Sequence, residues 1–284
     1  MKIFIANKST QKIGGGWSFI SNLTKYLKYK VEFIKNIADC DIFFIPSASM
    51  VSKENVDKAK KLKKKIILRV DNILKDSNNR GCGMSRLKKY ADMADMIVWQ
   101  CNWTKDYIGW WLKKEGIDIN KKSQIIYNGV DTEIFNPKGQ AMPKSGYPQY
   151  LYVRYGRDEQ KQWHQAWYEY QMIQRKNLKA HLWLVGKWSS EIVGYNFDFF
   201  VGEKYKYWGI VEDRNLMAQI YRGTDILLAP YYNDCFSQTM LEAAACGCHV
   251  ECNNTGGNLE LMQLKDISAK RMAEEYFNLF NFIL

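Results

Sequence analysis

The chain has 284 residues, which is enough for two domains of ordinary size. Apolar residues make up 46% of it and aromatic residues 14%, a composition that excludes a disordered protein. The sequence holds no run of about 18 apolar residues, so we expect no membrane span. Residues 1–145 hold 27 Lys and Arg against 14 Asp and Glu, a net charge of +13, while residues 146–284 hold 14 against 16. The first half therefore indicates either a polyanionic partner or a solvated lysine-rich surface, and the sequence leaves both open.

Seven cysteines, an odd number at irregular spacing, indicate reduced thiols. The first residues, MKIFIANKS, lead directly into a predicted strand without the apolar core of a signal peptide. We therefore expect a cytoplasmic protein, in the host cytoplasm if it is viral, with peripheral attachment to a membrane left open. Cys246, Cys248 and Cys252 lack the spacing of paired zinc knuckles, so we expect apolar packing there and no metal site.

The first half alternates predicted strands and helices. Residues 2–6 predict an apolar strand, residues 41–47 a buried strand, and residues 53–64 a basic helix. Between the first strand and its helix, a glycine turn would let the backbone come close to a ligand. That turn consists of Gly14, Gly15 and Gly16.

Two charged side chains follow the next predicted strand. This strand ends at Arg69, Val70 and Asp71. The carboxyl ends of parallel strands are where open α/β sheets bind ligands. Asp71 is therefore the leading polar candidate for a role near the reacting group, and Arg69 is a candidate for contact with an acceptor. A helix cap at Asp71, or a local ion pair between the two, is the alternative.

Four tryptophans gather in the next helical region, at positions 99, 103, 110 and 111. We expect most of them to pack in the core or between helices. Trp103 is retained as a candidate acceptor contact, because an exposed indole ring could stack on a sugar or a base.

The chain changes character after the first half. Asn128 and Gly129 predict a turn, and residues 138–148 hold Gly, Pro and Ser without an apolar pattern, as an interdomain linker does. We therefore expect one domain over residues 1–140 and a second over residues 141–267. An amphipathic helix is predicted over the remaining residues, 268–284.

The second domain begins with a strand that ends in basic residues. Arg154 and Arg157 follow this strand, and Lys161 lies in the first turn of the next helix. Arg binds phosphate oxygens bidentately and Lys supplies a point charge, so these side chains suit a diphosphate. Arg157 and Lys161 are the first choice, with Arg154 in reserve. Surface ion pairs with Asp158 and Glu159 are the alternative.

The stretch from Tyr231 to Glu260 predicts a loop, a helix, a short strand and a glycine turn. The helix has a helix-forming composition and stops at Gly247. Its N-terminus would offer backbone amides to an anion such as a diphosphate. A carboxylate inside it, Glu242, could accept two hydrogen bonds from a diol such as ribose. The amides belong to the segment Phe236, Ser237 and Gln238.

This stretch resembles the nucleotide-sugar signature of retaining GT-B glycosyltransferases of the family-four type, E-G-F-G-x-x-x-x-E-A-M-A-C-G-x-P-V followed by G-G-x-x-E. Its departures from the signature include Asp234 for Glu, Ser237 for Gly and His249 for Pro. The segment IIYNGVDTEIFNP, at residues 125–137, is similar to the family's exit from its N-terminal domain. The residues that align with the conserved letters of the signature, with Asp234 in place of the first Glu, are Asp234, Phe236, Glu242, Ala243, Ala245, Cys246, Gly247, Val250, Gly256, Gly257 and Glu260.

The resemblance implies an α/β protein of the GT-B class, with two Rossmann-like, doubly wound domains facing a central cleft. It implies that Glu242 binds the ribose, that Asp234 contacts hydroxyls of the donor sugar, and that Arg157 and Lys161 stabilise the leaving diphosphate. In this family a C-terminal helix crosses back to the first domain, so residues 268–284 could do so here. The turn at residues 14–16 would meet the donor phosphates, and the backbone that would hold the base belongs to Gly209, Ile210 and Val211.

We therefore expect a glycosyltransferase that moves a sugar from a nucleoside-diphosphate sugar, most readily a UDP-sugar, to a hydroxyl acceptor with retention, without cofactor or metal. The basic first half slightly favours DNA with hydroxymethylated bases as the acceptor. The alternative is a peripheral enzyme on an anionic membrane that modifies lipids or surface polysaccharide. A further alternative is a non-catalytic nucleotide-sugar-binding protein, because the chain departs from the signature at Asp234, Ser237 and His249 and its first half holds no histidine.

Overall fold

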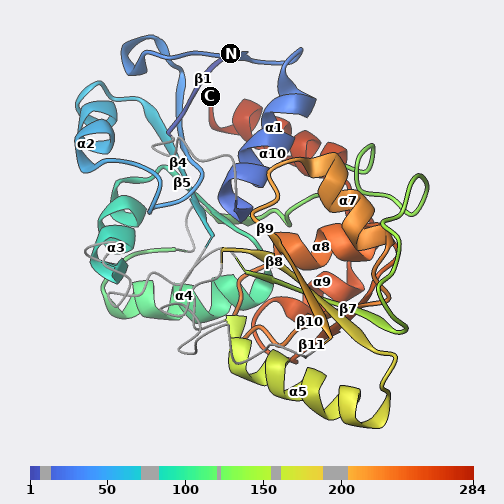
Figure 1. Cartoon of the computed structure of the whole chain (residues 1–284). Helices are drawn as coiled ribbons and strands as arrows, with labels where there is room; N and C mark the ends of the chain where they lie inside the picture. Colours follow the sequence, from blue (N-terminus) through green and yellow to red (C-terminus); the bar gives the residue numbers. More distant parts are fainter. Residues whose placement is uncertain (7–13, 72–82, 120–122, 155–160, 188–203) are drawn as a thin grey trace. The chain divides into compact units, whose positions relative to one another are not determined.

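The computed structural model describes residues 1–6, 14–71, 83–119, 123–154, 161–187 and 204–284 (Figure 1). They form two compact units. Unit 1 comprises Met1–Gly129 and Leu259–Leu284, and unit 2 comprises Val130–Asn258. Each unit holds one parallel sheet with its own helices, so the predicted doubly wound α/β architecture is confirmed. Among the described residues, no helix combines the length and apolar character needed to cross a bilayer.

Unit 1 is built on six parallel strands in the order β2-β1-β3-β4-β5-β6. Strands β3 and β5 are buried at every position, as expected for parallel strands that are covered on both faces. The strands are β1 (Lys2–Ile5), β2 (Glu32–Phe33), β3 (Ile42–Ile45), β4 (Lys65–Val70), β5 (Met96–Trp99) and β6 (Ser123–Ile125).

Two layers of helices cover this sheet. The strand order reverses at β1, and right-handed crossovers therefore place α1 on one face and α2, α3 and α4 on the other. Figure 1 shows α10 beside α1, and the edges of the Tyr276 and Phe280 rings in α10 meet Phe44 at 5.5 and 5.8 Å between ring centres. The helices are α1 (Gly15–Leu27), η1 (Ile37–Asp39), α2 (Lys53–Lys61), α3 (Gly83–Met93), α4 (Asn102–Lys114), α9 (Asn258–Gln263) and α10 (Ala269–Ile283).

Unit 2 is built on five parallel strands in the order β11-β10-β7-β8-β9. Here the order reverses between β7 and β10, and such a switch point opens a ligand crevice at the carboxyl ends of the two strands. The strands are β7 (Gln149–Arg154), β8 (His181–Gly186), β9 (Tyr205–Gly209), β10 (Ile226–Ala229) and β11 (His249–Cys252). The helices are α5 (Trp163–Lys176), α7 (Arg214–Arg222) and α8 (Gln238–Ala245).

Residues 138–148, where we expected a linker, belong to unit 2. The Arg222 guanidinium donates to the Gln140 carbonyl at 2.8 Å, and the backbone at Gly146 passes so close to Lys179 that a Cβ would lie 2.3 Å from its carbonyl oxygen. The chain instead passes between the units at residues 129–130 and 258–259, because these backbone contacts tie the polar segment to the second sheet.

A buried polar network joins strand ends of unit 1. Arg69 is only 2% exposed, and its guanidinium donates to the Pro46 carbonyl at 2.8 Å and to Asn128 Oδ1 at 2.9 Å. It lies 3.9 Å from the centre of the Phe19 ring. Asn128 in turn donates to Gln100 Oε1 at 2.6 Å. The network therefore ties the residues that follow β3, β5 and β6 to the guanidinium on β4.

Arg69→Ala should lower the free energy of unfolding by about 2–4 kcal/mol, because it leaves buried acceptors unsatisfied and opens a cavity beside Phe19. Urea titration followed by circular dichroism measures the loss. Lys61→Ala, on the exposed end of α2, is the control and should change stability by less than about 0.5 kcal/mol. Equal stability of the two variants would contradict the structural role of the network.

Candidate functional site

The strongest concentration of predicted site residues in unit 2 lies at the switch point. Arg154 is the last residue of β7 and is buried, Lys161 lies at the start of the segment leading into α5, and Asp234 lies on the loop after β10. Arg157 lies outside the described residues. Both strands therefore deliver charged side chains to the edge at which a doubly wound sheet binds ligands.

Lys161 and Asp234 form an ion pair. The Lys161 ammonium lies 2.6 Å from Asp234 Oδ2 and 3.8 Å from the centre of the Tyr231 ring. The two side chains are 21% and 18% exposed, so solvent and solutes still reach the pair. The Tyr152 hydroxyl donates to the Lys161 carbonyl at 2.7 Å and holds the backbone at this position. The structure thus brings together two predicted site residues that are far apart in the sequence.

The loop that carries Asp234 is held by the glycine turn of the same stretch. The Gly257 N–H donates to the Asp234 carbonyl at 2.8 Å, and the Thr255 hydroxyl accepts from the Asn233 N–H at 3.2 Å. Gly256 has φ +67°, and a Cβ there would lie 2.3 Å from the Asp234 carbonyl oxygen. The turn therefore needs a glycine both for its backbone angle and for the close approach of the two chain segments.

The N-cap residue of α8, Ser237, lies three residues beyond Asp234. The Ser237 hydroxyl caps the helix by accepting from the Met240 N–H at 3.5 Å, and Asp234 Oδ1 accepts from the Phe236 N–H at 3.2 Å. The side chains of Phe236, Ser237 and Gln238 are buried. Ser237 is thus a favourable N-cap residue at this position.

Glu242 is a buried carboxyl group on α8. It is 8% exposed and lies 3.4 Å from the Tyr221 hydroxyl, which donates to it. Burial raises the pKa of Glu242 to about 7, while the charge of Arg214 and the hydrogen bonds from Gln238 and Tyr221 act in the opposite direction. Near neutral pH the group is therefore divided between a carboxyl form that can donate and a carboxylate that only accepts.

Arg214 is a residue that we missed from the sequence. It lies in the first turn of α7, where the helix dipole disfavours a cation, and its guanidinium Nη1 lies 3.8 Å from Oδ2 of the fully buried Asp131. It lies 5.2 Å from the centre of the Phe135 ring, and its charge lowers the pKa of Glu242. A basic residue shortly after the segment Gly209–Val211 was the available signal.

The segment predicted to hold the base leads into α7. Gly209 ends β9 with φ +71°, and a Cβ there would meet no atom within 4 Å. Ile210 is 45% exposed, whereas Val211 is buried. The turn therefore offers open backbone and one exposed apolar side chain a few residues before Arg214.

The glycine turn of unit 1 is also open. Gly14 precedes α1 with φ +96°, and no atom lies within 4 Å of a Cβ built on it. The Gly14 carbonyl accepts from the Trp17 and Ser18 N–H groups, which starts the helix. Gly15 begins α1 and is exposed, while a Cβ on Gly16 would lie 2.8 Å from the Met50 sulfur. The turn is therefore open at Gly14 and closed by Met50 at Gly16.

Comparisons with known proteins identify this architecture. Residues 150–275 match the family described as glycosyl transferases group 1. The fold is similar to that of Anabaena HepE in complex with UDP-glucose, with a TM-score of 0.66, 12% identity, and coverage of 98% of this chain and 89% of HepE. The chain has the GT-B fold, and residues 150–275 are similar to group 1 glycosyltransferases. The predicted resemblance to GT-B glycosyltransferases is thus confirmed.

Two further solved structures share the GT-B fold. Sucrose-phosphate synthase from Thermosynechococcus elongatus has a TM-score of 0.66 and 14% identity, over 99% of this chain and 90% of that one. The catalytic domain of Arabidopsis thaliana starch synthase IV, bound to ADP and acarbose, has a TM-score of 0.63 and 13% identity, over 98% and 92%. No curated protein matches the sequence.

The acceptor candidates of this GT-B chain lie in unit 1. Arg69 Nη1 lies 3.8 Å from Asp71 Oδ2, so the local ion pair is present. The Asp71 side chain is 17% exposed, whereas the Arg69 guanidinium is buried and engaged, which favours a positioning role for Arg69. The Trp103 ring stacks on Tyr107 at 4.9 Å between ring centres, with 9° between their planes. Their contact with an acceptor stays a prediction.

The last acid of the glycosyltransferase signature, Glu260, anchors a helix of unit 1. Its carboxylate accepts from the Asn102 and Trp103 N–H groups at 2.9 and 2.7 Å and from the Tyr127 hydroxyl at 2.8 Å. Burial would raise the pKa of Glu260, but these hydrogen bonds overcome that effect and lower it. Glu260 therefore caps the N-terminus of α4, and its interaction with the helix dipole is favourable.

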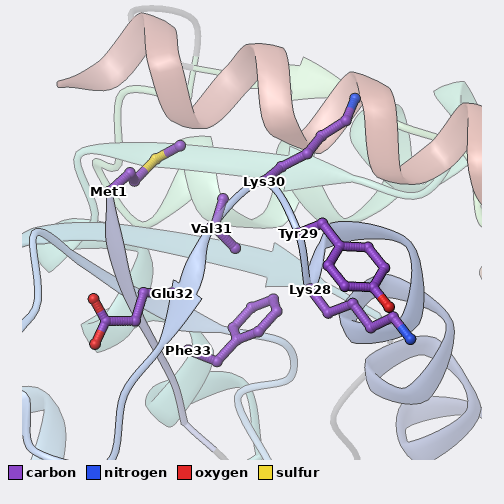
Figure 2. A pocket seen from close by; sticks show the side chains of 7 residues that line it. All are labelled: Met1, Lys28, Tyr29, Lys30, Val31, Glu32 and Phe33. Carbon is purple, nitrogen blue, oxygen red and sulfur yellow. The ribbon is translucent and has the colours of Figure 1, made fainter.

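A hollow of about 570 Å³ lies elsewhere on unit 1, at the start of β2 (Figure 2). It is lined by Met1 and residues 28–33. Lys30 pairs there with Glu274 of α10 and lies 4.9 Å from the centre of the Phe277 ring. None of the predicted site residues lines this hollow.

Gly256→Ala should destabilise the protein by about 3 kcal/mol or more, because it adds a collision with the Asp234 carbonyl to the strain of a positive φ. Gly209→Ala is the matched control: its φ is also positive but its surroundings are open, so a loss of about 1 kcal/mol is expected. Urea unfolding measures both. A smaller loss at Gly256 than at Gly209 would contradict the close approach.

Glu242→Gln should change how stability depends on pH. In the folded protein the pKa of Glu242 is about 7, above the ordinary value of 4.5. The stability that its protonated form contributes is therefore fully present below about pH 4.5 and is lost as the pH rises through 7. The variant should therefore gain roughly 1–3 kcal/mol relative to wild type between pH 5 and pH 8. Urea unfolding at both pH values measures the difference, and parallel pH profiles would contradict it.

Proposed function

We propose that this chain transfers a sugar from a nucleoside-diphosphate sugar to a hydroxyl acceptor, with retention of anomeric configuration. The observation that carries the proposal is the Lys161–Asp234 pair at the switch point of the glycosyltransferase domain. The ligands named for similar folds, UDP-glucose with HepE and ADP with starch synthase IV, support this donor class, and we expect a UDP-sugar. Retention rests on the resemblance to family-four enzymes.

The cationic side chains would stabilise the leaving diphosphate. Negative charge grows on its oxygens as the glycosidic bond breaks, and preorganised cations and amides lower the barrier most when they are aimed at that charge. Lys161, Arg157 and the reserve Arg154 are assigned this task, with the backbone amides at the start of α8. Since side chains supply these charges, the proposed reaction requires no metal.

The donor would also change the partners of the ion pair. A diphosphate that takes the Lys161 ammonium frees the Asp234 carboxylate, which can then accept hydrogen bonds from hydroxyls of the donor sugar. An aspartate is one methylene shorter than the usual glutamate, and its position beside Lys161 supports a coupled role. Binding of the phosphate and recognition of the sugar would therefore depend on each other.

The nucleoside would bind through neighbouring groups of the same domain. Glu242 in its carboxylate form would accept from the two ribose hydroxyls, and the base would lie along the segment Gly209–Val211. Arg214 supports the ionised form of Glu242 through its charge. In unit 1, Asp71 is our candidate for contact with the reacting sugar, and the turn at residues 14–16 for the donor phosphates.

The acceptor is proposed from charge and surface chemistry. The net charge of +13 over residues 1–145 supports a polyanionic partner. From the sequence, DNA with hydroxymethylated bases is slightly favoured over an anionic membrane. The exposed aromatic residues of α4 favour the membrane instead. The six cysteines among the described residues are free thiols, which supports the proposed cytoplasmic location.

Incubation with a panel of UDP-, ADP- and GDP-sugars should release nucleoside diphosphate with at least one donor, slowly by transfer to water and faster with an acceptor. Lys161→Ala should lower that rate roughly 100-fold or more, because a cation opposite the leaving group is lost. Lys176→Ala, on the exposed last turn of α5, is the control and should keep the rate of wild type.

Measured donor binding without release, for every sugar and acceptor tried, would leave a non-catalytic binder and end the proposal. A Glu242→Ala variant with normal donor affinity would show that the donor site lies elsewhere. The anomeric proton coupling of the product, measured by NMR, decides between retention and inversion.

A further inference from the structure

We propose that the outer face of α4 docks unit 1 onto a bilayer that contains anionic lipids. Docking would place the enzyme at a membrane surface, where its acceptor would be held. Only this placement of the acceptor rests on the proposed function. Docking itself is a binding event that needs no donor and no turnover.

Four aromatic side chains line one face of α4. They occupy positions 103, 107, 110 and 111, and at about 100° per residue they fall, together with Lys114, within an arc of roughly 100°. Tyr107 is 40% exposed, Trp110 49% and Trp111 43%. We expected most tryptophans of this region to pack in the core or between helices; Trp99 does, but Trp110 and Trp111 do not, because Ile108 and Leu112 bury the other face of the helix against its sheet.

The exposed rings are organised into one surface. The Trp103 and Tyr107 rings are stacked, and the Trp110 and Trp111 rings meet edge to face with 5.0 Å between their centres. The Lys114 ammonium lies 3.8 Å from the centre of the Trp110 ring. The face therefore combines broad apolar rings with a cation at their border.

This aromatic face belongs to a basic layer. The α2, α3 and α4 helices follow one another on the same side of the sheet of unit 1 (Figure 1). Residues 53–64, 83–93 and 102–115 hold 12 Lys and Arg against 5 Asp and Glu, a net charge of +7. Lys89 of α3 pairs with Asp57 of α2 at 2.9 Å, and Lys88 of α3 pairs with Glu115 after α4 at 2.7 Å. These ion pairs link the helices into one surface.

The chemistry of this surface fits a lipid headgroup region. Trp and Tyr rings, apolar in body and polar at one edge, concentrate at the boundary between acyl chains and water, and Lys stems extend along apolar surface while the ammonium reaches phosphate. A basic helix with aromatic residues on one face binds in the plane of the interface, more strongly when the lipids are anionic. Because Glu260 holds the first turn of α4, the rings are presented by an anchored helix.

Other occupants fit less well. DNA would use the lysines, but the three exposed rings would gain little beside duplex phosphates, since proteins contact those with polar and basic groups. A second copy of this chain would bring two layers of net charge +7 together, and like charges repel.

The test is flotation of the full chain with vesicles of phosphatidylcholine alone and of phosphatidylcholine with 30% phosphatidylserine. Wild type should float with the anionic vesicles, should be released as salt rises, and should not float with phosphatidylcholine alone. The double variant Trp110→Ser/Trp111→Ser should bind the anionic vesicles at least 10-fold more weakly. Tyr168→Ser, which removes a 62% exposed ring from α5 in unit 2, is the matched control and should bind as wild type does.

A second variant keeps the test independent of any loss of folding. Lys113→Gln/Lys114→Gln leaves the aromatic rings in place and should also weaken binding to anionic vesicles. Brominated lipids should quench the tryptophan fluorescence of wild type more than that of the double tryptophan variant. Both variants should release nucleoside diphosphate from the soluble donor at the wild-type rate, so failure of docking and failure of catalysis are separate results.

Three results would overturn the proposal. One is equal binding of wild type and both variants to anionic vesicles. Another is salt-sensitive binding to duplex DNA that the double tryptophan variant weakens while vesicle binding is unchanged. The third is a concentration-dependent dimer of wild type that the same variant abolishes without any vesicle binding.

Discussion

The candidate donor site depends on one close approach between two backbone segments. The loop after β10 holds Asp234 beside Lys161, and the chain at Gly256 passes so close to the Asp234 carbonyl group that even a methyl group is excluded. The Gly257 N–H donates to that carbonyl, so the approach is also a hydrogen bond. The glycine pair of the nucleotide-sugar signature, Gly256 and Gly257, is therefore a structural requirement of the loop that carries Asp234.

The chain passes between the units twice, and polar side chains hold it on both sides of each crossing. Asn128 belongs to the buried network of Arg69 in unit 1, whereas Asp131, three residues later, faces Arg214 in unit 2. At the second crossing the Asn258 amide donates to the Tyr231 carbonyl in unit 2, and Glu260 caps α4 in unit 1. Two motifs that indicate a glycosyltransferase thus contain the residues that fix where each unit ends.

Two departures from the family signature, Ser237 and His249, have local physical reasons. The Ser237 hydroxyl caps α8 by accepting a hydrogen bond from the Met240 N–H. The usual glycine has no side chain and could not form this bond. The His249 N–H donates to the Asp225 carbonyl at 2.9 Å, a bond that the usual proline could not form. Each change therefore adds a hydrogen bond that stabilises the element it belongs to, and neither one removes a charge from the candidate donor site.

The sequence alone determined the alternation of strands and helices, the glycine turns and the family signature, because these depend on neighbours a few residues apart. It could not decide which strands are adjacent. The pairing of Lys161 with Asp234, 73 residues away, therefore appeared only with the strand order. Nor could it show that Arg214 lies near Glu242 or that Trp110 and Trp111 face outward. Those outcomes depend on which face of a helix meets its sheet, and packing over the whole unit decides that.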